Sequence, residues 1–283
     1  MPALLVHLHL YYPDQTGYFI EKLSNICGCK WDLVVTCPEE CPEAVESLLS
    51  FKPDARIIQV ENSGYDVWPF IYVLDNTDIG KYDYVLKLHT KNRSEKERFN
   101  GIHFRDYQWR NCLVDSLVGS REVFGRNLAA FGKDRTTGIL FGYPVLRKLT
   151  RGLPEDLGML ADEMKRLGLE IKDRRFCAGT MFMARIQPYA ALCGGAVPPG
   201  IFSSVQRSHS IGSMAHVYER ILTMVVTSSG LNLRTVPYSI SMDVPAFLNR
   251  TFSPVIKNIF SLERLGADRR KCLRILGLKF FLE

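Results

Sequence analysis

One stretch of the sequence, residues 82–94, places phosphate-binding groups at the end of an apolar run. The run closes on His89-Thr90-Lys91, and Arg93 follows two residues later. Lysine and arginine side chains are cationic donors, and histidine can donate from its ring, so these three residues suit phosphate oxygens. The pattern predicts a phosphate-binding site. The alternative is a solvated basic loop, because surface lysines and arginines are mostly exposed.

A second loop, residues 61–66 with the sequence ENSGYD, lies between an apolar run and a helical pattern. Asparagine, glycine and aspartate build turns through side-chain bonds to the backbone and through positive φ. We interpret Asn62, Gly64 and Asp66 as ligand-binding residues, with Gly64 admitting a ligand close to the backbone and Asp66 accepting hydrogen bonds. The alternative is a turn with no ligand.

Two histidines near the N-terminus, His7 and His9, are two residues apart, so they face the same side of a strand. The pattern places His9 at the wall of the phosphate-binding site. A histidine pair is also a candidate for a metal, but without a nearby acid it more often forms hydrogen bonds in a core.

A general base for proton removal is predicted in the segment MAHVYERIL. His216 and Glu219 are three residues apart on a helix and share a face. Glu219 is the candidate base, His216 the residue that orients it or binds phosphate, and Asp66 the competing base. The alternative for Glu219 is a helix-surface pair with a neighbouring charge.

The segment FCAGTMFMAR, residues 176–185, is predicted to be one short apolar strand. Gly179 and Thr180 within it permit close approach of a ligand to the backbone, while the methionines pack in the core. Three aromatic residues are candidates for stacking on a flat ligand such as a sugar or a base, and the sequence does not choose among Trp68, Tyr65 and Trp109.

Strand and helix patterns alternate along most of the chain. Strands are predicted over 3–12, 31–37, 55–62, 82–90, 136–144 and 176–185, and helices over 16–26, 42–52, 67–75, 107–128, 155–169 and 213–230. Segment 194–202 is predicted to be an exposed loop. The alternation indicates an α/β fold, a mostly parallel twisted sheet flanked by helices, whose ligands bind at the carboxyl ends of the strands.

Composition favours a globular chain of one domain with an appendage. It has 283 residues and a net charge of +6, and residues 250–283 hold eight Lys/Arg against three Asp/Glu. This basic, partly apolar tail predicts contact with an anionic membrane surface, and it lacks the aromatic and basic interleaving of a nucleic-acid surface. With no apolar span and no leader pattern, we expect a cytoplasmic protein, peripheral at the inner membrane face.

The eight cysteines are expected to be reduced thiols in such a compartment. A cluster of four of them raises a zinc hypothesis, although their spacing is not that of a familiar zinc knuckle. The four are Cys27, Cys29, Cys37 and Cys41.

Five segments in order resemble the rhamnan synthesis F family of bacterial polysaccharide glycosyltransferase-like proteins: VHLHLYYPD, ENSGYDVWPFIYVL, YDYVLKLHTKNRS, FCAGTMFMAR and GSMAHVYERIL. The resemblance covers roughly residues 4–235. It implies a GT-A-like enzyme that transfers rhamnose or another hexose from a nucleotide diphosphate donor to a lipid-linked or polysaccharide acceptor. The resemblance implies a sugar pocket lined by Gly179, Thr180 and Trp68. The donor-site residues that it implies are His9, Asn62, Gly64, Asp66, His89, Lys91 and Arg93. GT-A enzymes usually carry Asp-x-Asp where this chain has His89-Thr90-Lys91, so we expect an inverting transferase with no catalytic metal and no cofactor.

The resemblance divides the chain into a glycosyltransferase domain, residues 1–249, and a basic amphipathic tail, residues 250–283. Two other functions stay open: a non-catalytic module that binds or assembles glycans, and a sugar-phosphate transferase that would use the same basic clamp. The sequence does not distinguish the donor nucleotide, the sugar, the linkage or the oligomeric state.

Overall fold

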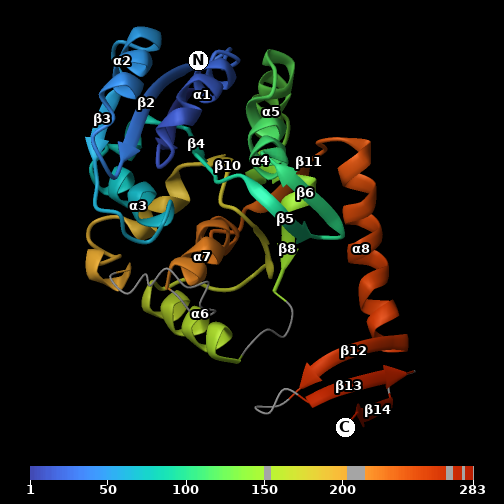
Figure 1. The fold of residues 1–283 in the computed structure, drawn as a ribbon. Helices are drawn as coiled ribbons and strands as arrows, with labels where there is room; N and C mark the ends of the chain where they lie inside the picture. The colour runs from blue at the N-terminus through green and yellow to red at the C-terminus, as the bar shows by residue number, and fades with distance from the viewer. Residues whose placement is uncertain (150–153, 203–213, 266–269, 276–277, 283) are drawn as a thin grey trace.

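The core of the structure is a seven-stranded sheet with the strand order β11-β7-β10-β4-β1-β2-β3. The computed structural model describes residues 1–149, 154–202, 214–265, 270–275 and 278–282 (Figure 1). Neighbouring strands are parallel except at β10, which is antiparallel to β4 and β7. The strands are β1 Ala3–His9, β2 Lys30–Cys37, β3 Arg56–Gln59, β4 Tyr84–His89, β7 Thr137–Gly142, β10 Phe182–Arg185 and β11 Asn232–Val236.

Helices form layers against this sheet (Figure 1). One layer contains α1, α2, α4 and α5, and the other contains α3, α6 and α7 with the turn η4. The bounds are α1 Thr16–Leu23, α2 Pro42–Phe51, α3 Val67–Asp75, α4 Gln108–Val118, α5 Arg121–Lys133, α6 Pro154–Arg166, α7 Met214–Ser228, η1 Pro13–Gln15, η2 Ile79–Lys81, η3 Tyr143–Val145, η4 Gln187–Leu192 and η5 Pro199–Phe202.

The central strands are buried because helices cover both faces of the sheet. Leu4, Leu5, Val85 and Leu86 have no exposed surface. Strands covered on both faces read as continuous apolar runs, which is how β1 and β4 appear in the sequence. The predicted α/β class, with its mostly parallel sheet, is therefore confirmed.

Two predicted elements are each divided in the structure. The predicted strand over 176–185 becomes β9 (Arg175–Cys177) and β10, because Gly179 and Thr180 between them adopt φ of +81° and +48°. A left-handed backbone cannot continue a strand. The predicted helical pattern over 107–128, interrupted at Gly119, forms two helices. It ends at Val118, directly before that glycine, and restarts as α5, where the Ser120 hydroxyl accepts a hydrogen bond from the Val123 amide (3.2 Å).

Several elements of the structure have no counterpart in the prediction. They are the hairpin β5 (Ser94–Phe99) and β6 (Ile102–Asp106), the short strand β8 (Leu146–Lys148) that pairs with β9, the edge strand β11, and helix α8 (Ile240–Ile259). The predicted exposed loop over 194–202 is wrong at its end. Phe202 lies in η5 and is buried, because its ring packs against Trp68 and Tyr218.

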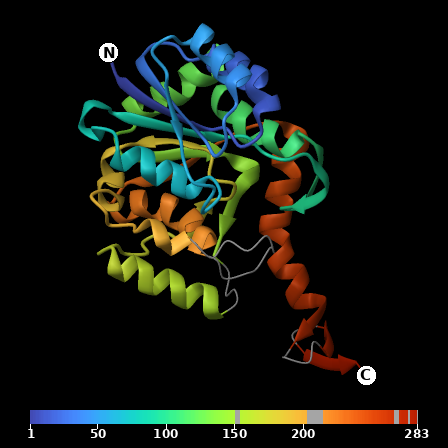
Figure 2. The ribbon, with the colours of Figure 1, turned by 60° about the vertical axis from the view of Figure 1, so that its left-hand side comes forward.

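The C-terminal part of the chain extends away from the sheet (Figure 2). Helix α8 leads into an antiparallel meander of β12 (Phe260–Leu265), β13 (Arg270–Ile275) and β14 (Leu278–Leu282). The domain boundary proposed after residue 249 falls inside α8. Among the residues that the structure describes, no helix is both long enough and apolar enough to cross a membrane.

Candidate active site

Four basic side chains come together on adjacent strands β1 and β4. The parallel register pairs His7 with Lys87 and His9 with His89. Positions two apart on a strand share a face, so both pairs face the same helical layer. His7 stacks on Phe70 of α3 with ring centroids 5.6 Å apart, which identifies that layer as the one with α3 and α7.

An acid from the loop before α3 closes this cluster. The Lys87 ammonium group donates hydrogen bonds to Asp66 Oδ2, to the Thr180 carbonyl oxygen (3.1 Å) and to Thr180 Oγ1 (3.2 Å). The Thr180 hydroxyl is also bonded to Asp66 Oδ2. Lys87 is fully buried, whereas the Asp66 side chain keeps 18% of its surface exposed. The acid therefore lies at the mouth of the cluster and the lysine at its floor.

The electrostatics keep this pair as carboxylate and ammonium. Burial alone would raise the pKa of Asp66, but the basic groups His89 and Lys87, with hydrogen bonds from Lys87 and Thr180, hold that pKa well below its ordinary 3.8. Burial lowers the pKa of Lys87, and Asp66 opposes that effect. A buried lysine that has all three donors bonded is satisfied without a ligand.

The histidines of the cluster are neutral at neutral pH. Burial lowers the pKa of His7 and His89 well below 6.5, and it lowers the pKa of His9 to about 4. The Thr36 hydroxyl lies 2.9 Å from His7 Nε2 and 3.0 Å from His9 Nδ1. His89 Nδ1 is 3.4 Å from Asp66 Oδ2, yet it makes no hydrogen bond among the described residues.

The predicted base is part of the same site. Glu219 of α7 accepts a hydrogen bond from the Gly179 amide (2.8 Å), and it is close enough to Lys87 to oppose the lowering of the lysine pKa. His216, one turn earlier on α7, is half-buried, with its ring 6.4 Å from that of Tyr65. The structure thus brings Asp66, Thr180 and Glu219 together from three separate segments.

Strained backbone lies on both loops that carry these groups. Tyr65 and Thr180 adopt φ of +56° and +48°, each directly after a glycine with positive φ. Left-handed geometry is costly for a β-branched residue such as threonine. Such strain persists only where the surrounding structure enforces it, and it concentrates at functional sites. At Thr180 the enforcing contacts are the bonds to Asp66 and Lys87.

Other predicted phosphate ligands lie at the edge of the cluster or outside it. Lys91 is half-buried, with Nζ 6.0 Å from the centre of the Trp109 ring. Arg93 is exposed and donates from Nε to Asp106 (2.7 Å) on the β5–β6 hairpin. Asn62 is exposed on its loop. The predicted roles of these three residues remain predictions.

The packing of Gly64 and Trp68 favours a structural role over the predicted one. A Cβ on Gly64 would lie 2.9 Å from the Phe202 ring, so the space above this glycine is filled by protein. Trp68 is buried and contacts Phe202 and Tyr72. Trp109 is likewise buried, between Phe99 and Phe104.

Sequence reasoning missed Lys87 and Thr36. A lysine inside an otherwise apolar strand, two residues before His89, is an available signal, because a buried charge requires a partner. Thr36 lies one residue before the end of β2, opposite His9, and only the strand pairing indicates that contact.

The cysteine cluster and the histidines do not assemble a metal site in the described part of the chain. No group of three or more histidine, cysteine or acidic side chains there is arranged to hold a metal ion. Cys27, Cys29, Cys37 and Cys41 are free thiols.

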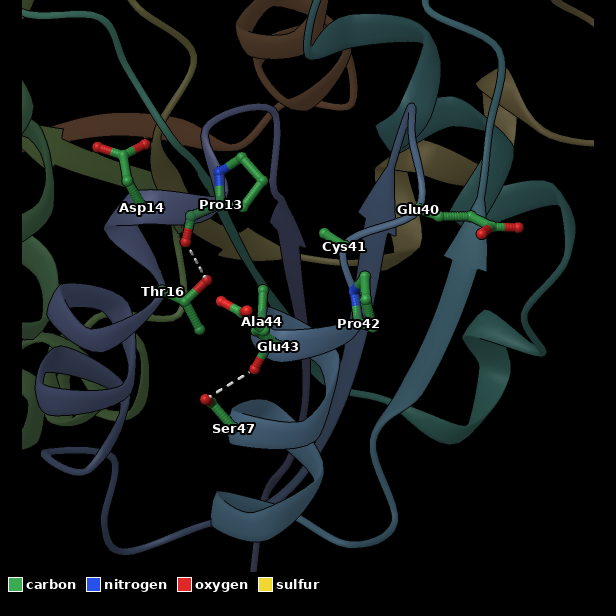
Figure 3. Close-up of a pocket in the computed structure, with 9 residues that line it drawn as sticks. All are labelled: Pro13, Asp14, Thr16, Glu40, Cys41, Pro42, Glu43, Ala44 and Ser47. Carbon is green, nitrogen blue, oxygen red and sulfur yellow. Dashed lines mark hydrogen bonds between the residues drawn. The ribbon is translucent and has the colours of Figure 1, made fainter.

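A separate cavity of about 590 Å³ opens between the first turns of α1 and α2 (Figure 3). Its lining includes Pro13 and Thr16 on one side and Cys41, Pro42 and Ala44 on the other. Neither Asp66 nor any other residue of the candidate site lines this cavity.

Fold and site together define an α/β protein with a cluster of buried charged and polar groups on the neighbouring parallel strands β1 and β4. The chain belongs to the rhamnan synthesis protein F family, which matches residues 2–231. This match confirms the resemblance found in the sequence. The uncharacterised protein WxcX of Xanthomonas campestris pv. campestris is 25% identical over 244 residues, covering 85% of this chain and 34% of the relative. The chain thus spans about a third of the length of the curated relative it matches.

Two solved structures are distantly similar. Residues 1–349 of Staphylococcus aureus TarS are 12% identical, with 84% of this chain and 58% of that chain covered and a TM-score of 0.42. A putative nucleotide-diphospho-sugar transferase from Desulfovibrio desulfuricans G20 is 9% identical, with 90% and 96% covered and a TM-score of 0.35. Such low scores do not support transferring a site or a substrate.

Proposed function

We propose that this chain is a glycosyltransferase of bacterial surface-glycan synthesis. In this proposal it moves rhamnose or another hexose from a nucleotide diphosphate donor to a lipid-linked or polysaccharide acceptor at the cytoplasmic face of the inner membrane. Membership in the rhamnan synthesis protein F family supports a role in surface-glycan synthesis, and the candidate active site supports sugar transfer. The observation that carries the proposal is the Lys87–Asp66 pair with Glu219 beside it, at the carboxyl ends of the strands.

The geometry favours Glu219 over Asp66 as the base. A carboxylate whose pKa is held far below neutrality is a weak proton acceptor, and one Asp66 oxygen already accepts bonds from Lys87 and Thr180. Glu219 uses Oε1 to accept from the Gly179 amide, and Oε2 has no hydrogen bond among the described residues. In the proposed inverting step, Oε2 takes the proton of the acceptor hydroxyl while the oxygen attacks the anomeric carbon and the nucleoside diphosphate leaves.

Asp66 is better suited to holding the donor sugar. Its side chain is partly exposed, ionised and fixed in position by Lys87, so its remaining acceptor capacity can orient sugar hydroxyls. We place the diphosphate beside the His89 ring, whose buried Nδ1 lies 3.4 Å from Asp66 Oδ2, and the half-buried Lys91 adds a cation nearby.

The same pair supports the proposal that no divalent metal takes part. A metal at the other oxygen, Asp66 Oδ1, would still lie close to the Lys87 ammonium group that is bonded to Oδ2 of the same carboxylate, and like charges at that separation repel strongly in a buried site. Because Lys87 already neutralises this carboxylate, Asp66 attracts a divalent cation less than an unpaired acid would.

The test is a turnover assay with a panel of nucleotide diphosphate sugars and polyprenyl-linked glycan acceptors. Release of nucleoside diphosphate and the mass of the glycan product are measured together. Glu219→Gln should lower turnover by about 10²-fold or more and leave donor binding within a factor of a few. The exposed Glu122→Gln is the matched control. Unchanged turnover in Glu219→Gln contradicts its role as base, and a product that retains a phosphate indicates sugar-phosphate transfer instead.

A further inference from the structure

The outer face of α8 is an exposed apolar stripe. Its large side chains are Ile240, Val244, Phe247, Leu248 and Phe252, with exposed fractions of 84%, 47%, 51%, 48% and 48%. The spacing of four, three, one and four residues places them on one side of the helix. Only Ser241 and Thr251 share that exposed side, so no charge interrupts the stripe over the part of α8 whose side chains are described.

The opposite face of α8 fixes the helix to the body of the protein. Ala246 is fully buried, and the Arg250 guanidinium donates to the carbonyl oxygens of Tyr143 and Leu146, both at 3.1 Å. Gly101 in the β5–β6 turn allows α8 to pack closely, because a Cβ at this position would lie 3.0 Å from the Asn249 Cβ. The stripe is therefore held outward by packing on the other side of the helix.

The stripe gathers half of the large exposed apolar side chains in the part of the chain whose side chains are described. Ten such side chains are exposed there, and five of them are on this one helix face. The others are Met1, Tyr11, Leu49, Tyr65 and Ile171, which are far apart in the chain. Single exposed apolar residues are ordinary, but a contiguous patch marks an interaction site.

We infer that this stripe docks on the surface of an anionic lipid bilayer. At 1.5 Å per residue the stripe is roughly 18 Å long, enough for a helix lying in the plane of the interface. Its apolar area is roughly 400 to 500 Å², below the ~800 Å² per partner of a stable dimer. Docking on a bilayer needs no such area, because the apolar side chains have only to enter the boundary region beneath the lipid headgroups.

Charge identifies the kind of lipid. The chain that follows the stripe, residues 253–283, carries seven Lys/Arg against three Asp/Glu. The described parts of this segment continue α8 and form the meander, which extends away from the sheet in the direction of the helix axis (Figure 2). An apolar helix face followed by a basic segment matches an anionic surface, where each cation near the headgroups adds about 1 kcal/mol. This inference does not depend on the proposed sugar transfer.

The experiment is vesicle co-sedimentation of the full chain. The probes are phosphatidylglycerol vesicles and pure phosphatidylcholine vesicles at low and high salt. The test variant is Val244→Gln/Phe247→Gln/Leu248→Gln, and the matched control is Leu49→Gln/Ile171→Gln, which removes exposed apolar side chains elsewhere. Glutamine is a good helix former, so α8 is retained, and circular dichroism verifies this.

We expect wild type and control to bind phosphatidylglycerol vesicles, binding to weaken with salt, and the α8 variant to bind roughly tenfold more weakly or worse. Undiminished binding by the α8 variant overturns the inference. So does light scattering that shows a dimer in wild type and a monomer in the α8 variant, because a second copy would then cover the stripe.

Discussion

Lys87 and Asp66 form an ion pair between the floor and the mouth of the candidate site, and Thr180 bonds to both. Lys87 comes from the middle of a central strand, and Asp66 comes from the loop before α3. The pair fixes the position of Asp66, which the proposal assigns to the donor sugar, relative to strand β4. It therefore contributes both to the stability of the fold and to the geometry of the proposed site.

The first prediction concerns the stability of this pair. Lys87→Met leaves Asp66 as an uncompensated carboxylate over a buried site, so the free energy of unfolding should fall by about 3–5 kcal/mol. Urea denaturation measures the change. The double variant Lys87→Met/Asp66→Asn should recover part of the loss, because it removes both charges.

The matched control is the exposed pair of Lys81 and Asp78, whose side chains are 73% and 65% exposed. Lys81→Met should change the free energy of unfolding by less than about 1 kcal/mol. If Lys87→Met lowers the free energy of unfolding no more than Lys81→Met does, the Lys87–Asp66 pair contributes no more to stability than an exposed ion pair.

The second prediction is a loss of stability in mild acid. The pKa of His9 falls from 6.5 to about 4 on folding, so between these values the unfolded chain binds more protons than the folded one. The free energy of unfolding should therefore fall as pH drops, by up to about 1.4 kcal/mol per pH unit for this group. His7 and His89 act in the same direction.

Urea denaturation at about pH 7 and about pH 5 measures this effect. His9→Gln should flatten the pH dependence, whereas His103→Gln at an exposed position should leave it unchanged. Equal slopes in wild type and His9→Gln would mean that His9 is not buried in its neutral form.

The third prediction separates packing from ligand binding at Gly64. Gly64→Ala places a methyl group 2.9 Å from the Phe202 ring at φ +64°, so it should cost about 1–3 kcal/mol of stability. Gly125 within α5 has nothing within 4 Å of its would-be Cβ, and Gly125→Ala should stabilise by about 0.5–1 kcal/mol. If Gly64→Ala is as stable as wild type, the position is free to serve a ligand as the sequence suggested.

The order of strands and helices in the first half of the chain was predictable because their patterns are local. Helix α3 has the predicted bounds, Val67–Asp75, and α1 and α2 deviate by only a few residues. The break between β9 and β10 at Gly179 and Thr180 was not predictable from the pattern of apolar residues. Its left-handed backbone is held by contacts with Asp66 and Lys87, which are distant in the sequence.

The candidate site was predictable residue by residue but not as an arrangement. Asp66, His89, Thr180 and Glu219 were proposed separately, and the structure places them around one buried ammonium group. Lys87 was overlooked because a lysine in a strand reads as an edge or surface residue until its partner is known. The pairing of that lysine with an acid 21 residues earlier depends on tertiary structure, as does the outward face of α8.

The central claim is that the Asp66–Lys87–His89 cluster binds a nucleotide diphosphate sugar without a metal ion. A thermal-shift screen against a panel of nucleotide sugars, with EDTA and with Mn²⁺, tests it directly. We predict that one donor at about 100 times its Kd raises the Tm by roughly 5–10 °C, equally in EDTA, and that Asp66→Asn and His89→Gln remove the shift while His103→Gln keeps it. A panel with no shift, a shift that EDTA abolishes and Mn²⁺ restores, or a shift that survives in both site variants would contradict the claim.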